Sequence, residues 1–99
     1  MYTVDLTKSY FPALGGDEPS PITIGDMLRA STAAAPDRPA LKALDYDGTI
    51  LRTWSYAELL EEAERLARAL ASRHDEGARI AVYANNVPEW VLLEIASAL

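Results

Sequence analysis

The sequence predicts a small α/β domain, and three patterns in it lead to that prediction. Apolar side chains recur every three or four residues over two stretches, which is typical of amphipathic helices. Two short apolar runs flank Asp47-Gly48, a residue pair that favours a β-hairpin turn. The end of the chain then follows the order strand, tight turn and apolar helix, which is the beginning of a βαβ unit.

Composition limits the classes of protein to which this chain of 99 residues can belong. Apolar residues make up 49% and charged residues 24%, a balance typical of a folded domain rather than a disordered segment. Nine basic and fifteen acidic residues give a formal charge of -6, which disfavours binding to nucleic acid or anionic lipid. The absence of cysteine excludes disulfides and thiolate zinc sites. Because neither a signal peptide nor an apolar stretch of membrane-spanning length is found, we predict a cytoplasmic protein.

The chain divides into two regions with different sequence patterns. Residues 1–22 contain Pro and Gly at a density that blocks both helix and central strand, so we expect an extended N-terminal arm. Residues 23–99 carry the periodic segments and are expected to form the folded part. Its first helix is expected to begin at Thr23, whose hydroxyl can cap it, and to be stopped by Pro36.

A β-hairpin is expected over residues 40–46 and 49–54. Asp47-Gly48 accepts the positive φ angles of a type I′ turn between the two strands. The apolar residues of the first strand change parity within it: Leu41, Ala43, Leu44 and Tyr46. Either a β-bulge or a strand that is apolar on both faces explains this change.

The long amphipathic helix has the strongest local signals in the sequence. Ser55 and Glu58 have the spacing of a capping box, and Trp54 and Leu59 have that of a hydrophobic staple. Apolar residues then recur along one face of the helix as far as its expected end near Arg73: Leu59, Ala63, Leu66 and Leu70. Two i,i+4 ion pairs are expected on the other face: Glu61 with Arg65, and Glu64 with Arg68.

An incomplete βαβ unit is expected at the end of the chain. Residues 79–84 form an apolar run of strand length. Asn86 and Pro88 suit the cap and first turn of a helix whose residues 90–99 are apolar on nearly every side. Because the returning parallel strand is missing, we expect a truncated chain that belongs to a longer protein. We also expect the chain to self-associate through this apolar helix as a twofold dimer.

No side chain is assigned a catalytic, cofactor-binding or metal-binding role from the sequence. Asp45 and Asp47 invite a magnesium site, but Asp beside a hairpin turn is more simply a turn former. His74 lies at a helix end and is interpreted as a surface residue. Trp90 could line a ligand pocket, although core packing explains it better. The adjacent acidic residues are interpreted as solvated surface rather than as general acids or bases: Glu61, Glu62, Asp75 and Glu76.

The segment Thr53-Trp54-Ser55-Tyr56-Ala57-Glu58-Leu59 resembles the first core motif of the AMP-forming adenylating enzymes, which include the acyl-CoA synthetases. The surrounding segments follow the family's order as well, at residues 23–28, 35–41, 66–70, 79–83 and 85–90. The resemblance identifies residues 23–99 as a truncated N-terminal part of an AMP-binding ligase domain. It implies the corresponding N-terminal portion of the adenylate-forming ligase fold.

The resemblance also implies the chemistry of a parent enzyme in fatty acid metabolism. Such an enzyme uses ATP and magnesium to adenylate a carboxylic acid and then transfers the acyl group to coenzyme A. The family's phosphate loop, acidic magnesium residue and adenylation lysine have no counterpart in this sequence. We therefore expect the chain to be inactive without the remainder of the parent ligase. Two other interpretations stay open: a stand-alone interaction domain that binds through its apolar last helix, and part of a peptide-synthetase adenylation domain.

Overall fold

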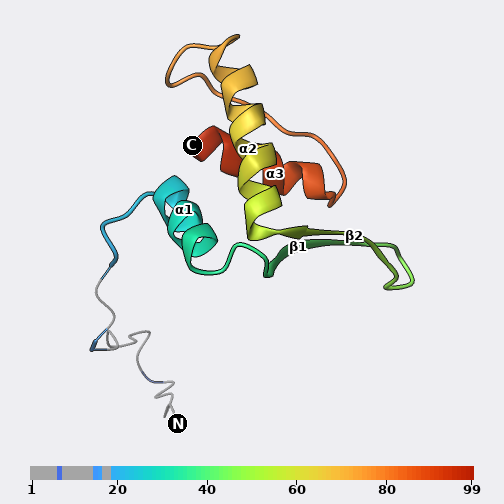
Figure 1. Cartoon of the computed structure of the whole chain (residues 1–99). Helices are drawn as coiled ribbons and strands as arrows, with labels where there is room; N and C mark the ends of the chain where they lie inside the picture. The colour runs from blue at the N-terminus through green and yellow to red at the C-terminus, as the bar shows by residue number, and fades with distance from the viewer. Residues whose placement is uncertain (1–6, 8–14, 17–18) are drawn as a thin grey trace.

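The computed structural model describes residues 7, 15–16 and 19–99, which contain three helices and one β-hairpin. The elements follow in the order α1 (Ile24–Ala34), β1 (Pro39–Leu44), β2 (Ile50–Ser55), α2 (Tyr56–Ala71) and α3 (Pro88–Ala98). Helix α2 lies at the centre, with α1 on one side, α3 crossing it, and the hairpin projecting from its N-terminal end (Figure 1). The predicted mixed α/β class is thus confirmed in this coarse form. Most of the predicted N-terminal arm, residues 1–22, lies outside the described residues.

Helix α1 begins where its sequence predicts. The hydroxyl of Thr23 accepts a hydrogen bond from the backbone N–H of Asp26, at 3.1 Å, and so satisfies one of the free donors of the first turn. The helix ends at Ala34, before Pro36. Proline disfavours a helical conformation in the residue before it, and this accounts for the position of the end.

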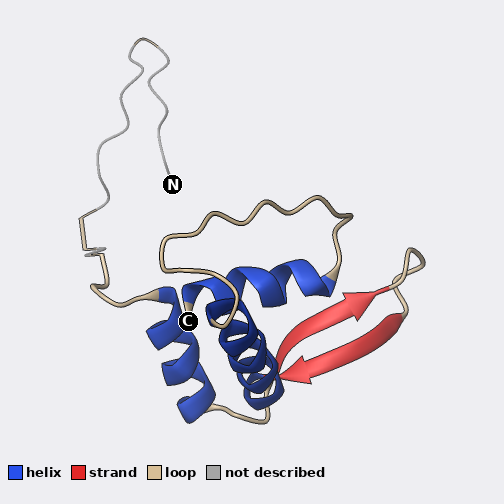
Figure 2. Ribbon diagram, turned by 90° about the horizontal axis from the view of Figure 1, so that it is seen from above, coloured by secondary structure: helices blue, strands red, loops and turns tan. Residues whose placement is uncertain are grey.

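The two strands pair in antiparallel register, with Leu41 opposite Trp54. The register shifts between Pro39 and Leu41 and again between Ala43 and Leu44. Of the two explanations for the change of parity in the first strand, the structure therefore favours an irregular, bulged pairing. Most of the hairpin extends beyond the helices, as Figure 2 shows.

The turn of the hairpin differs from the predicted type I′ geometry. Among the described residues only glycines have a positive φ angle, and Gly48 is one of them, at +86°. Its N–H donates to the carbonyl of Asp45 at 2.9 Å, while the N–H of Asp45 donates to Thr49 at 2.8 Å. This is the geometry of a type I turn followed by a left-handed glycine. The prediction failed because Asp47 avoids the left-handed region, and only glycine enters it without steric cost.

Strand β2 passes into α2 without a linker, because Ser55 is both the last strand residue and the N-cap of the helix. The predicted capping box is present. The Ser55 hydroxyl accepts from the N–H of Glu58 at 3.2 Å, and the Glu58 carboxylate accepts from the N–H of Ser55 at 2.8 Å. The direction of α2 is thereby tied to the direction of the strand before it.

The loop between α1 and β1 satisfies two more N–H groups at the start of α2. Tyr56 donates to the carbonyl of Arg38 at 3.0 Å, and Ala57 donates to the carbonyl of Pro36, also at 3.0 Å. These donors have no partner within an α-helix and would otherwise need water. The two bonds therefore hold the end of α1 close to the beginning of α2.

The core lies at this junction. Leu28 of α1, Trp54 of β2 and Leu59 of α2 are 7%, 4% and 4% exposed and form one cluster. Leu92 and Ile95 of α3 pack against it from the side. The predicted pairing of Trp54 with Leu59 over the helix end is thus part of the main hydrophobic core rather than a local feature.

The predicted strand over residues 79–84 is not formed. Residues 72–87 run as a loop along one side of α3 (Figure 2). A strand is defined by pairing with a neighbour, and among the described residues β1 and β2 pair only with each other. The predicted incomplete βαβ unit is therefore wrong in this structure, because a helix follows a loop there. Helix α3 begins at Pro88 as expected, but its cap is Val87 and not Asn86, without a side-chain hydrogen bond.

Within the part of the chain that the structure describes, none of the helices combines the length and the apolar character needed to cross a bilayer.

Replacing Ser55 with Ala is expected to destabilise the fold by about 1 kcal/mol, since the N–H of Glu58 loses its acceptor. Urea unfolding followed by circular dichroism measures this change in the free energy of unfolding. Ser97→Ala is the matched control, because that hydroxyl only donates to a carbonyl of its own helix. Equal effects of the two substitutions would contradict the role assigned to the capping box.

Replacing Gly25 with Val is expected to destabilise the contact between α1 and α3 by about 1–3 kcal/mol, because the site is already tightly packed. A Cβ at this position would lie 3.1 Å from Cδ2 of Leu99 and 3.2 Å from the carbonyl oxygen of Ala98. The control is Ala30→Val on an exposed position of α1, where only helix propensity changes, by less than about 0.7 kcal/mol. The prediction fails if both variants unfold at the same urea concentration.

Candidate functional site

The motif at residues 53–59 spans the end of β2 and the first turn of α2. Four of its side chains have structural partners. Trp54 and Leu59 are buried in the core, while Ser55 and Glu58 form the capping box. The motif therefore sets the junction between strand and helix, and these four side chains do not point into an open site.

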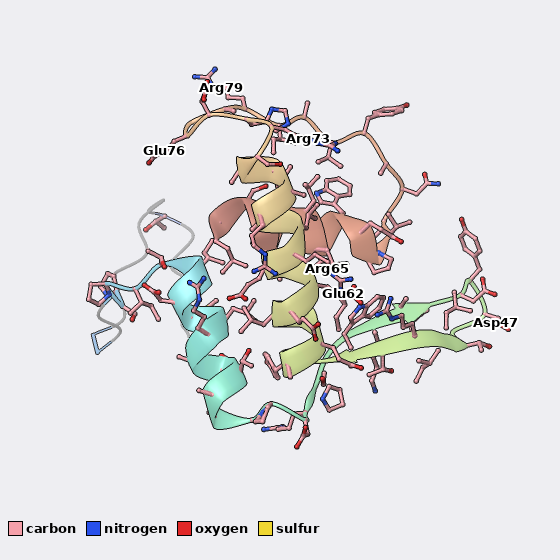
Figure 3. The ribbon with its side chains drawn as sticks, turned by 45° about the horizontal axis from the view of Figure 1, so that its top comes forward. Asp47, Glu62, Arg65, Arg73, Glu76 and Arg79 are labelled. Carbon is pink, nitrogen blue, oxygen red and sulfur yellow. The ribbon has the colours of Figure 1, made fainter. Side chains whose placement is uncertain are left out.

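A polar network joins the hairpin to α2 beside this motif. The carboxylate of Glu62 accepts a hydrogen bond from the indole N–H of Trp54 at 3.1 Å and forms an ion pair with Arg52. The guanidinium of Arg52 lies over the Trp54 ring, 4.1 Å from its centre, in a cation–π contact. Glu62 is on the side of α2 that faces the hairpin (Figure 3). The three side chains thus hold one strand against the central helix.

This network lowers the pKa of the Glu62 carboxyl. The hydrogen bond from Arg52 is the largest cause, and the hydrogen bond from Trp54 is the second. Both favour the ionised form, so Glu62 serves as a fixed anionic acceptor and not as a proton donor near neutral pH.

The sequence interpretation of Glu62 as solvated surface is therefore wrong, since its side chain is only 26% exposed and has two partners. A signal was available in the sequence. Arg52 and Trp54 are two residues apart on a strand and so share one face. A buried tryptophan also needs an acceptor for its N–H, and Glu62 is an acidic residue on the following helix.

The two aspartates of the hairpin form the turn. The Asp45 carboxylate accepts from the N–H of Tyr46 at 2.7 Å, and the Asp47 carboxylate accepts from the N–H of Thr49 at 2.9 Å. The hydrogen bonds from Thr49 lower the pKa of Asp47, which lies at the tip of the hairpin (Figure 3). Both residues thus act as the turn formers that the sequence predicts. Among the described residues, no three His, Asp or Glu side chains lie close enough together to hold a metal ion.

An apolar hollow lies between α3 and the loop before it. Its volume is about 290 Å³. The loop contributes Ala78, Ile80 and Val82 to its lining, and α3 contributes Trp90, Leu93, Glu94 and Ser97. Trp90 is 42% exposed, so it lines this hollow and is not part of the core that the sequence predicts for it. The hollow has the chemistry to accept apolar side chains.

A second hollow of about 540 Å³ lies where the C-terminal ends of α2 and α3 approach the loop after α2. His74, Asp75 and Glu76 line its rim, and Leu70 and Ala96 line its apolar part. All three polar residues are exposed, as predicted for a solvated turn. Glu76 lies in this loop with Arg73 and Arg79, away from the motif at the other end of α2 (Figure 3).

The family is decided by comparison with known proteins. Residues 28–99 match the AMP-binding enzyme family, over most of α1 and all of the hairpin, α2 and α3. This chain belongs to the AMP-binding enzyme family. The membership predicted from residues 53–59 is thus confirmed.

A comparison with a curated relative shows how much of a related enzyme this chain spans. The chain is 33% identical over 94 residues to the mitochondrial medium-chain acyl-CoA ligase ACSF2 of Danio rerio. The match covers 94% of this chain and 15% of that protein. The chain therefore spans about one seventh of the length of this ligase. No solved structure matches it.

Replacing Glu62 with Gln is expected to lower the free energy of unfolding at neutral pH by about 1 kcal/mol, because the ion pair with Arg52 is lost. The pKa of Glu62 is lower in the folded chain than in the unfolded chain, where it is about 4.5. Its stabilisation is therefore complete above that value and is lost as the pH falls through the lowered pKa.

Urea unfolding between neutral pH and pH 3 measures this difference. Glu61→Gln, at the exposed neighbouring position, is expected to change stability by less than about 0.5 kcal/mol. Wild type and Glu62→Gln should converge in stability at the acid end. A constant difference down to pH 3 would show that the network does not act through the charge of Glu62.

Proposed function

We propose that this chain is part of an ATP-dependent acyl-CoA ligase. In the first reaction a carboxylate oxygen attacks the α-phosphorus of ATP, which forms an acyl-adenylate and releases pyrophosphate. In the second, the thiol of coenzyme A takes the acyl group and AMP leaves. The observation that carries the proposal is the AMP-binding family match over residues 28–99, together with the 33% identity to an acyl-CoA ligase.

Medium-chain fatty acids are the proposed acyl substrates of the parent enzyme. The proposal follows the name of the Danio rerio relative, a medium-chain acyl-CoA ligase. ATP, magnesium and coenzyme A are the proposed cofactors and co-substrate of the parent. We also propose the cytoplasm as its location, which cell fractionation tests directly.

These residues are proposed to act as a scaffold and to be inactive without the rest of the ligase. Adenylation needs cationic groups or N–H donors directed at the phosphates and a metal ion that spreads their charge. Three of the arginines here are instead engaged with glutamates: Arg52 with Glu62, and Arg29 and Arg68 with Glu64. Arg52 and Arg29 link α2 to β2 and α1, while Arg68 pairs within α2, which supports a structural role.

A second candidate function is a small interaction domain, favoured by the exposed apolar surface along α3. Ile80 is 44% exposed and Trp90 is 42% exposed beside an open hollow.

The reading frame after Leu99 discriminates between the candidate functions. Several hundred further codons that encode a Gly/Ser/Thr-rich loop favour the ligase, whereas a stop codon favours the interaction domain. A downstream carrier domain would instead favour a peptide-synthetase adenylation domain.

ATP–pyrophosphate exchange tests the catalytic prediction, with carboxylic acids of about 4 to 16 carbons as substrates. The quantity measured is the radioactive label that passes from pyrophosphate into ATP. The 99-residue chain is expected to give no exchange above background. The product of the longer reading frame is expected to give exchange that is largest with the medium-chain acids.

The matched control is the longer protein without ATP or without magnesium, which removes the reactants and keeps the fold. Exchange by the 99-residue chain would overturn the scaffold proposal. Absence of exchange from the longer protein with every acid would overturn the ligase proposal itself.

A further inference from the structure

The turn of the hairpin contains a residue pair that can react with itself. Asp47 is the one aspartate of the sequence that is followed by glycine. An aspartyl side chain can be attacked by the backbone nitrogen of the next residue, which closes a five-membered succinimide ring. Glycine hinders this attack least, because it has no Cβ and a permissive backbone. Asp47–Gly48 is therefore the aspartyl bond of this chain that is most disposed to ring closure.

Solvent reaches this pair without obstruction. Asp47 and Gly48 are both exposed, and Asp47 lies at the tip of the projecting hairpin (Figure 3). A Cβ at Gly48 would meet no atom within 4 Å, apart from its neighbours in the chain. Hydroxide, which removes the amide proton, and water, which opens the ring, therefore have free access to the reacting atoms.

Two hydrogen bonds of the closed turn oppose the reaction. The N–H of Gly48, whose nitrogen would attack, donates to the carbonyl of Asp45 at 2.9 Å. The carboxylate of Asp47, which would be attacked, accepts from the N–H of Thr49, also at 2.9 Å. Hydrogen bonds from Thr49, above all from its backbone N–H, lower the pKa of Asp47 and so favour the ionised carboxylate, which is a poor electrophile. Both reacting groups are thus engaged while the turn is closed.

We infer that Asp47–Gly48 is a modification site at which an isoaspartyl link forms when the hairpin turn opens, and that the two hydrogen bonds of the turn set the rate. In the open turn the nitrogen of Gly48 bonds to Cγ of Asp47. The amide proton and the carboxyl hydroxyl leave together as water. The inference is independent of the proposed catalytic function.

Water then opens the ring at one of its two carbonyl carbons. Addition at Cγ of Asp47 breaks the new bond and restores the aspartate. Addition at the backbone carbonyl carbon breaks the original peptide bond, so that the chain continues through the side chain to Gly48 and the α-carboxylate is free. One water leaves and one returns, so the mass is unchanged and nothing is oxidised or reduced.

The isoaspartyl product has a longer backbone than the turn accommodates. Its main chain gains one carbon atom at residue 47, whereas the bonds across the turn, such as the 2.8 Å bond from the N–H of Asp45 to Thr49, depend on the original spacing. The tip of the hairpin is therefore expected to loosen. The exposed isoaspartyl carboxylate is the class of substrate that isoaspartyl carboxyl methyltransferases modify, with S-adenosylmethionine as the methyl donor.

Incubation of the whole chain, folded in buffer and unfolded in urea, tests the inference. Transfer of a radioactive methyl group by such a methyltransferase measures isoaspartate, and electron-transfer mass spectrometry locates it in the chain. We expect isoaspartate at residue 47 in both samples, forming roughly 10- to 100-fold more slowly in the folded chain, where two hydrogen bonds must first open. Amide hydrogen exchange of Gly48 is expected to be slowed by a similar factor, because it needs release of the same N–H.

Two variants at residue 49 isolate the bond to the carboxylate. Thr49→Pro removes the N–H that donates to Asp47 and is expected to speed isoaspartate formation in the folded chain by roughly tenfold. Thr49→Val is the matched control, because it keeps this N–H and the branched shape, and it should change the rate less. Asp47→Glu is expected to remove the signal at residue 47, since a glutamate would have to close a six-membered ring.

Three results would overturn the inference. The first is an unfolded chain that forms no isoaspartate at residue 47, or forms it equally at the other aspartates. The second is an equal rate in the folded and unfolded chains, which would show that the turn does not control the reaction. The third is a Thr49→Pro variant that reacts no faster than Thr49→Val.

Discussion

The direct passage from β2 into α2 is the constraint on which the rest of the described structure depends. Ser55 ends the strand and caps the helix, so no residue between them can change direction. Trp54, one position earlier, is consequently held at the base of the helix, where Leu28 and Leu59 cover it. The loop after α1 then bonds to the first turn of α2, which brings α1 to the same place. One short segment thus aligns a hairpin and two helices.

The charged residues of this acidic chain reinforce the same junction. Glu62 and Glu64 of α2 pair with arginines from β2 and α1, respectively, so the central helix is linked on two sides. Of these contacts the one at Glu62 is the stronger, because an indole N–H and a stacked guanidinium add to the ion pair. Exposed pairs such as Arg68 with Glu64 contribute little to stability by comparison. The motif at residues 53–59 is therefore an architectural element of this chain.

Helix α3 is only partly covered by the rest of the described structure. Leu92 and Ile95 pack on the core, but only Ala96 of this helix is buried. Trp90 and the loop residues beside it line an open hollow instead. A helix that is apolar on nearly every side needs cover on more than one side. The described residues provide that cover on one side, through the contacts of Leu92 and Ile95 with the core.

The sequence by itself determined the features that depend on a few neighbouring residues: the cap at Thr23, the capping box at Ser55, the position of the hairpin and the family to which residues 28–99 belong. Such features are local, because a cap or turn is complete within four or five residues. Tertiary structure alone decided the contact of Arg52 and Trp54 with Glu62, the shifted register of the strands and the loop conformation of residues 79–84. Each of these depends on which distant segments meet, and a strand in particular cannot form until another segment supplies the hydrogen bonds along its edge.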